Sequence, residues 1–213
     1  FRPAQAEGKA RLRERLGLPE RARIVVFAGR LVSWKGPLIL LEAWRRLVND
    51  QAASPATLGG PQPLLLFLGA GGADLHNCEA EARAFVAAHG MEGGVRFLGD
   101  VTAVADFPRS ADAFAFPSAR EAFGMAVVEA MATGLPVVTT SVAGLADYVR
   151  DGENALAVDP EDPAGLRRAL GAVLEDPALR ARLSEGAVRT ARRFSQEGVV
   201  DAHVELFRRL LSG

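Results

Sequence analysis

Short apolar runs that alternate with segments of helical spacing constrain the fold of this chain more than any other feature. Residues 24–28 read Ile-Val-Val-Phe-Ala without a polar interruption, which indicates a strand buried on both faces. Similar runs occur at residues 64–68, 95–98, 113–116, 135–140 and 155–158. Between them, residues 38–48, 79–89 and 104–110 are predicted to be helical. Strands alternating with helices predict right-handed crossovers and a parallel sheet covered on both faces.

The sequence therefore predicts an α/β fold, a doubly wound, Rossmann-like parallel sheet with a C-terminal helical tail. From residue 162 onward only helical spacing remains, over residues 164–174, 177–194 and 196–211. We expect three parts: a linker and helix at 1–20, the sheet domain at 21–195 and a C-terminal helix at 196–213. Residues 49–63, rich in Pro, Gly and Ser, are predicted to form a surface loop. In such sheets, ligands bind beyond the carboxyl ends of the strands.

Composition narrows the functional classes. A net charge of −1 offers no electrostatic basis for nucleic-acid binding, and no dense Lys/Arg block marks a membrane surface. The single cysteine, Cys78, rules out an internal disulfide and a cysteine-based zinc cluster. No apolar run approaches the ~20 residues that a membrane-spanning helix requires. The chain begins at Phe1 rather than at a methionine, so we expect it to be part of a longer protein.

The most informative segment spans residues 117–138. A strand ends at Pro117, a polar loop follows, and a helix is predicted to begin near Gly124. A helix that begins at the carboxyl end of a strand directs unpaired N–H groups and a positive dipole into the ligand crevice, where a phosphate would bind. The backbone N–H groups of Phe123, Gly124 and Met125 are the expected phosphate cradle.

Two glutamates flank this helix start, with seven residues between them. Glu121 lies in the loop, where it can accept hydrogen bonds from sugar hydroxyls beside the phosphate. Glu129 lies among apolar residues of the helix, so it should be partly buried and need a partner, for which a ribose hydroxyl is suitable. Either glutamate alone would be an ordinary helix-surface charge, so the hypothesis depends on the whole ordered set.

This ordered set resembles the signature of the family 4 glycosyltransferases, retaining enzymes of GT-B fold. The pairs Gly29-Arg30 and Lys35-Gly36 are similar to the phosphate-binding loop of that family. The resemblance continues through residues 97–99, 111–112, 141–152 and 159, and covers residues 22–175. It implies that the chain is the C-terminal, donor-binding domain of an enzyme in which two Rossmann-like domains face each other.

The resemblance implies that Arg30 and Lys35 hold the diphosphate of a nucleotide-sugar donor and that Glu121 contacts the donor sugar. As the sugar leaves, negative charge grows on the β-phosphate, and two fixed cations stabilise that transition state more than the ground state. Arg30, Lys35 and Glu121 are therefore the expected catalytic residues. Because these cations and the helix terminus supply positive charge, and no Asp-x-Asp triplet is present, no metal or other cofactor is expected.

Turns after the other strands complete the expected site. The turn at residues 69–72 is either a ligand loop or only a flexible strand exit; in the resembled family it lies near the nucleotide and the sugar. In that family, residues 99–101 hold the base mainly through backbone atoms. Residues 141–144, after the fifth strand, are a candidate border of the sugar. The expected nucleotide-sugar-binding residues are Gly29, Gly71, Gly99, Asp100, Val101, Phe123, Gly124, Met125 and Glu129.

Five positions depart from the family pattern. Ala122, Ala143 and Ala155 stand where glycines are usual, Asp147 where a glutamate is usual, and Pro108 where an aromatic residue is more common. None of these changes removes a charged group from the expected site. They leave the identity of the donor open, because loops beside the sugar select it.

Two alternatives to a glycosyltransferase stay open, a nucleotide-sugar epimerase of the same fold and a non-catalytic nucleotide-sugar-binding domain. A dinucleotide oxidoreductase is disfavoured, because no G-x-G-x-x-G follows the first strand. The expected partners are a nucleotide-sugar donor and a missing N-terminal domain that carries the acceptor site. We expect no nucleic acid, no transmembrane segment, and a cytoplasmic location, with peripheral attachment to the membrane through the missing domain as an alternative. The fragment alone is expected to be inactive.

Overall fold

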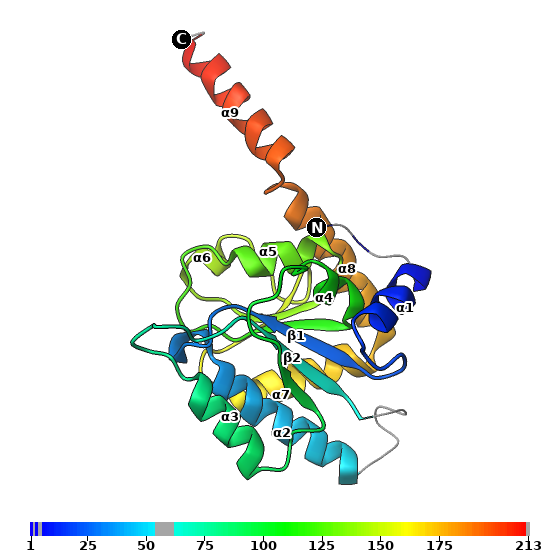
Figure 1. Cartoon of the computed structure of the whole chain (residues 1–213). Helices are drawn as coiled ribbons and strands as arrows, with labels where there is room; N and C mark the ends of the chain where they lie inside the picture. The colour runs from blue at the N-terminus through cyan, green and yellow to red at the C-terminus, as the bar shows by residue number, and fades with distance from the viewer. Residues whose placement is uncertain (2, 4–5, 54–61, 212–213) are drawn as a thin grey trace.

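The computed structural model describes residues 1, 3, 6–53 and 62–211. Within them, parallel strands form one sheet in the order β3-β2-β1-β4-β5-β6, as Figure 1 shows in part. The strands are β1 (Ile24–Ala28), β2 (Leu64–Leu68), β3 (Val95–Phe97), β4 (Ala113–Phe116), β5 (Val137–Thr140) and β6 (Leu156–Val158). The strand order reverses between β1 and β4, which is where a ligand crevice opens in such sheets.

Helices cover both faces of the sheet (Figure 1). On one side lie α2 (Pro37–Ala53), α3 (Glu79–Ala88) and α7 (Pro163–Glu175), and on the other lie α4 (Asp106–Ser110), α5 (Met125–Ala132) and α8 (Pro177–Arg192). Helix α1 (Ala6–Arg15) packs on α4, and α9 (Gln196–Leu211) projects beyond α8. The predicted doubly wound α/β fold is confirmed.

Apolar residues of the central strands explain why the sheet is covered on both faces. All five residues of β2 are buried, and four of the five in β1 are buried as well. The Phe27 ring lies 5.3 Å from that of Phe67 and 6.0 Å from that of Phe116 (centroid to centroid), so aromatic contacts join three neighbouring strands. A sheet with this composition has to bury both faces to remove its apolar surface from water.

Some predicted boundaries were wrong. Residues 49–53 were assigned to a loop but continue α2, because no helix-breaking residue occurs before the serine and proline at positions 54 and 55; residues 54–61 lie outside the described part of the chain. Strand β5 was predicted to begin at residue 135 but begins at Val137. Pro136 has no N–H group to donate to a neighbouring strand, so the strand starts after it. A 3₁₀ turn, η1 (Ser33–Lys35), and α6 (Ala143–Ala146) were not predicted, because both are too short to show periodicity.

Helix α9 exposes a largely apolar face. Phe207 is 58% exposed and Leu211 is 88% exposed. In an amphipathic helix of a globular protein, such a face is normally buried against the core. No helix in the described ranges is both long and apolar enough to cross a membrane. The domain boundaries expected at residues 20 and 195 remain predictions.

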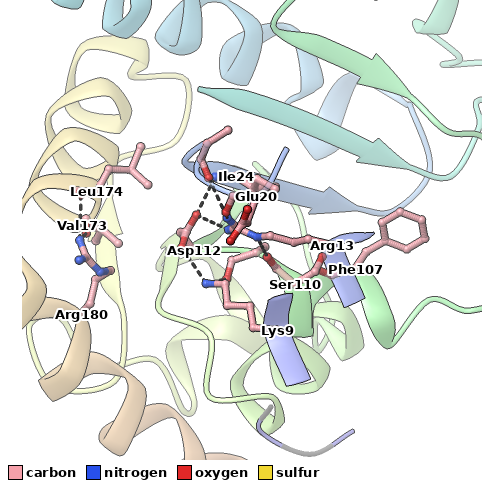
Figure 2. A network of polar contacts seen from close by, with 12 residues as sticks. Lys9, Arg13, Glu20, Ile24, Phe107, Ser110, Asp112, Val173, Leu174 and Arg180 are labelled. Atoms are coloured by element: carbon pink, nitrogen blue, oxygen red, sulfur yellow. Dashed lines mark hydrogen bonds and ion pairs between the residues drawn. The ribbon is translucent and has the colours of Figure 1, made fainter. Parts of the chain in front are cut away.

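Asp112 is the centre of a polar network at the amino edge of the sheet (Figure 2). Its carboxylate accepts hydrogen bonds from Lys9 Nζ (2.7 Å), Arg13 Nη2 (2.8 Å) and the backbone N–H of Ile24 (2.8 Å). The Arg13 side chain is 7% exposed and also donates to the Ser110 carbonyl oxygen (2.8 Å). The network therefore joins α1 to the first residue of β1 and to the residues that precede β4.

Charge pairing keeps Asp112 ionised in spite of its burial. Burial alone raises the pKa of this carboxyl, but the charge and hydrogen bond of Lys9, the Ile24 N–H and the charge of Arg13 outweigh it, so the pKa lies below its ordinary value. A buried carboxylate with three donors and two cationic partners stabilises the fold only while every member is present.

Replacing Asp112 with Asn should lower the free energy of unfolding by about 3–5 kcal/mol at neutral pH, because two cations lose their counter-charge. The folded-state pKa of Asp112 lies below the unfolded-state value, so its stabilisation is complete above about pH 4 and is lost as the pH falls through the folded value. The stabilities of wild type and variant should therefore converge in acid. Urea unfolding at neutral and acidic pH measures both quantities.

Asp50→Asn is the matched control, since Asp50 is 60% exposed and pairs with Arg167 on the surface (2.6 Å). Its cost should be below about 1 kcal/mol. Equal losses in the two variants would show that the Asp112 network contributes no more than a surface ion pair.

Candidate functional site

The loops after β1 and β4 are bound to each other at the carboxyl edge of the sheet. The Ala119 N–H donates to the Trp34 carbonyl oxygen (2.7 Å). Gly36 has a left-handed backbone (φ 74°), and a Cβ there would lie 2.3 Å from the Pro117 carbonyl oxygen. Only glycine therefore permits this approach, which carries Lys35 toward the loop that holds Glu121.

Lys35 and Glu121 form an ion pair across these two loops. Their side chains are only 16% and 13% exposed, and the Lys35 ammonium lies 5.0 Å from the centre of the Phe116 ring. The sequence assigned the two residues to different parts of a ligand and did not indicate that they pair. The ammonium has three N–H donors and the carboxylate has two acceptor oxygens, so both keep bonding capacity for a ligand.

Helix α5 begins beside this ion pair. Its N-cap, Gly124, has φ 82° and provides no side-chain cap. A Cβ at Gly124 would lie 2.5 Å from Leu145 Cδ2, so the position requires glycine for space as well as for conformation. In the described part of the chain, the N–H groups of Phe123, Gly124 and Met125 donate to no protein acceptor. The helix start thus presents donors to an anion.

Glu129 lies one turn further along α5 and is partly buried. It has no hydrogen-bond or ion-pair partner among the described residues, and burial raises its pKa above the ordinary value of 4.5. Glu129 lines a cavity of about 310 Å³ beyond the ends of β1, β2 and β3, together with Gly29, Arg30, Asp100 and Val101. The structure therefore brings together five of the residues that the sequence singled out.

Close backbone contacts form the wall of this cavity. The Gly69 N–H donates to the Gly99 carbonyl oxygen (2.7 Å). A Cβ at Gly69 would lie 2.3 Å from the Gly29 carbonyl oxygen. The three glycines therefore bring the ends of β1, β2 and β3 close together.

Arg30 lies at the rim of the cavity and is more accessible than Lys35. Its side chain is 60% exposed and forms an ion pair with Asp74, which is 16% exposed. The guanidinium also lies 5.8 Å from the centre of the Trp34 ring. Asp74 had not been singled out from the sequence, because no strand or motif places it near Arg30. An anion at this rim would share Arg30 with Asp74.

The N–H group of Gly71, another expected residue, is already bound within the protein. Its N–H donates to the Glu79 carboxylate (2.9 Å), and a Cβ there would overlap the Asn77 side chain. The hydrogen bond from Gly71 and the side chain of Arg83 lower the pKa of Glu79. The donor at Gly71 is thus occupied by α3, and this residue is absent from the lining of the cavity.

Two supporting residues lie behind the Glu121 loop. The Gly144 N–H donates to the Glu121 carbonyl oxygen (3.2 Å), and a Cβ at Gly144 would lie 1.6 Å from the Ala122 carbonyl oxygen. The Tyr148 hydroxyl donates to the Phe123 carbonyl oxygen (2.8 Å). Sequence reasoning placed residues 141–144 beside the sugar but missed Tyr148, for which no motif gave a signal.

Comparisons with known proteins point to one family. A family model described as glycosyl transferases group 1 matches residues 8–190. A D-inositol 3-phosphate glycosyltransferase of Nocardioides sp. is 36% identical over 217 residues, covering 98% of this chain and 46% of that protein. The chain therefore spans about half the length of the curated relatives it matches.

Solved structures share the fold. HepE of Anabaena in complex with UDP superposes with a TM-score of 0.83 at 26% identity, over 99% of this chain and 54% of that one. Sucrose-phosphate synthase of Thermosynechococcus elongatus superposes with a TM-score of 0.80 at 28% identity, over 100% of this chain and 50% of that one. Because the family model matches most of its length, the chain belongs to the glycosyl transferases group 1 family.

Proposed function

We propose that this chain is the donor-binding domain of a retaining glycosyltransferase, which moves a sugar from a nucleotide diphosphate sugar to an acceptor. The observation that carries the proposal is the convergence, at one edge of the sheet, of the Lys35–Glu121 pair, the start of α5 and the cavity that Arg30 and Glu129 line together. Two similarities support it: HepE was solved with UDP, and curated relatives are named as glycosyltransferases.

The geometry suggests one orientation for the donor. The base would lie against the backbone of residues 99–101, and a ribose hydroxyl would donate to the Glu129 carboxylate, which has no partner among the described residues. The diphosphate would then reach Lys35 and the free N–H groups at Gly124 and Met125, with Arg30 at the rim. The sugar would lie next to Glu121, on the open side of the crevice.

In this orientation the chain's charges act on the leaving group. The bond between the anomeric carbon and the β-phosphate oxygen breaks, and the nucleoside diphosphate takes the electron pair. Lys35, Arg30 and the α5 N-terminus stabilise the charge that develops there. A donor phosphate oxygen takes the proton of the acceptor hydroxyl as the new bond forms on the same face. Neither a protein base nor a metal ion is required for this step.

The alternatives differ in what they require of the site. An epimerase would need an acid and a base on either side of a sugar carbon, whereas Glu121 is the one titratable side chain proposed to contact the sugar, and it is paired with Lys35. A non-catalytic domain would bind the donor equally well. The two can be distinguished by adding an N-terminal domain with an acceptor site. The enzyme that we propose should then transfer sugar, whereas a non-catalytic domain should not.

Lys35→Ala and Arg30→Ala should each weaken binding of a nucleoside diphosphate by about 1.5–3 kcal/mol, because each removes a charge-assisted hydrogen bond. Binding of the matching nucleoside should hardly change. Calorimetric titration with UDP, GDP, ADP and dTDP, and with their nucleosides, measures both. Arg46→Ala, on the exposed side of α2, is the control and should affect neither ligand. Equal losses for diphosphate and nucleoside would exclude these cations from the phosphate site.

Glu129→Gln should weaken every nucleotide with an intact ribose by about 1.5–3 kcal/mol, since a charged acceptor is lost. Because burial raises the pKa of Glu129 above 4.5, wild-type affinity should fall as the pH drops through that raised value, while the variant should lack this dependence. Affinity measured from about pH 8 to pH 4, compared between wild type and variant at each pH so that titration of the ligand's phosphate cancels, tests both points.

Glu121→Gln is the matched comparison for Glu129→Gln. It should weaken binding of the nucleotide sugar while leaving nucleoside diphosphate binding unchanged or tighter, because Lys35 loses its competing carboxylate. Identical effects of the two substitutions on both ligands would contradict the assigned roles.

The isolated chain should bind its nucleoside diphosphate yet show no multiple-turnover sugar transfer. The proposed donor contacts all lie within it, but the acceptor surface does not, and well-oriented reactants can gain ~7–11 kcal/mol from positioning. Incubation of the purified chain with the best-bound donor and a broad acceptor set tests this. Sustained transfer would show that a second domain is dispensable.

A further inference from the structure

We propose that Tyr148 is a positioning residue that aims the backbone N–H groups at the start of α5 toward the diphosphate. The inference rests on the proposed function, because it explains how the same phosphate cradle is held. Tyr148 does not line the donor cavity. It lies behind the loop that connects Glu121 to α5 and acts only through the backbone of that loop.

The Tyr148 hydroxyl contacts two successive carbonyl groups. Its oxygen lies 2.8 Å from the Phe123 carbonyl oxygen and 3.3 Å from that of Gly124. The residue is only 2% exposed. Burial, and then the negative charge of Glu121, raise the pKa of Tyr148, so the hydroxyl keeps its proton and acts as a donor.

Peptide planarity transmits this contact to the other side of the loop. The C=O and N–H of one trans peptide point in opposite directions. The Phe123 carbonyl shares its plane with the Gly124 N–H, and the Gly124 carbonyl shares its plane with the Met125 N–H. With both carbonyls directed to Tyr148 or into α5, the two N–H groups point away from Tyr148, and they donate to no acceptor among the described residues.

The helix start needs such a restraint because of its sequence. Gly124 occupies the left-handed region (φ 82°) and no side chain caps α5. Glycine adopts positive and negative φ with similar ease, so the Phe123–Gly124 peptide can rotate without a steric barrier from a Cβ. Rotation would turn the Gly124 N–H out of the cradle. The hydrogen bond from Tyr148 opposes it.

Two aromatic neighbours fix the position of the hydroxyl. The Tyr148 ring lies 5.5 Å from the Phe123 ring and 5.3 Å from the Phe194 ring, and the latter two lie 5.2 Å apart (centroid to centroid). The Phe123 ring belongs to the loop and moves with it, whereas Phe194 follows α8 and lies outside the loop, so the contact with Phe194 holds the Tyr148 ring in place if the loop moves. This contact provides the support that a preorganised donor site requires.

The experiment compares two variants, each of which removes a hydroxyl group that donates to a backbone carbonyl at one end of α5. Tyr148→Phe keeps the ring and removes the bond to the Phe123 carbonyl. Thr133→Val removes a similar bond at the other end, where Thr133 Oγ1 donates to the Ala130 carbonyl oxygen (2.7 Å). The ligands are UDP, GDP, ADP and dTDP with their nucleosides, and unfolding of both variants is measured alongside.

Tyr148→Phe should weaken the best-bound nucleoside diphosphate by about 3- to 10-fold, the value of one hydrogen bond, and leave the nucleoside unaffected. Thr133→Val should lower stability to a similar degree without changing either affinity. If Tyr148→Phe binds the diphosphate as tightly as wild type, or loses nucleoside affinity equally, the inference is wrong. Absence of all binding by wild type would overturn the proposed function, and this inference with it.

A second measurement avoids substitution altogether. Tyr148 is the single tyrosine of the chain, so uniform incorporation of 3-fluorotyrosine places one ¹⁹F label beside the hydroxyl. The resonance should shift on addition of the best-bound nucleoside diphosphate and stay in place with its nucleoside. If the ¹⁹F chemical shift does not change although calorimetry shows that the diphosphate binds, a link between Tyr148 and the cradle would be contradicted.

Discussion

Parallel pairing between β1 and β4 is the constraint on which the proposed site depends. Val25 lies opposite Ala113 and Val26 opposite Phe114, so both strands end at the same edge of the sheet. The connection after β1 leads to α2 on one face, and the connection after β4 leads to α5 on the other. Two loops that leave neighbouring strands for opposite faces have to part, and the crevice between them is where the charged residues meet.

The two edges of the sheet are held by different kinds of interaction. At the amino edge, Asp112 joins α1, β1 and β4 through partly buried ion pairs and hydrogen bonds. At the carboxyl edge, contacts that only glycine allows bring the backbones together, at Gly36 against Pro117 and at Gly144 against Ala122. The polar network thus stabilises the amino edge, away from the proposed site. At the carboxyl edge the backbones pack directly on each other, so side chains there stay available to a ligand.

The carboxyl edge also retains groups that the fold itself does not satisfy. Glu129 has no partner among the described residues although burial disfavours its charge, and the N–H groups at the start of α5 remain open. Such unsatisfied groups lower stability and are expected where a ligand completes the structure. Lys35 and Glu121 are only partly unsatisfied, because they form an ion pair with each other and still have bonding capacity for a ligand.

The sequence by itself determined the α/β class and the parallel sheet, and it supplied the residues of the proposed site, because strand and helix periodicity, glycines and charges are local properties of the chain. Five expected residues do converge on one cavity, including Arg30 and Glu129. Only the tertiary structure decided the pairing of Lys35 with Glu121, the occupation of the Gly71 N–H by Glu79 and the position of Tyr148 behind the loop. Each joins residues that lie far apart in the sequence or depends on a side-chain direction, which periodicity does not encode.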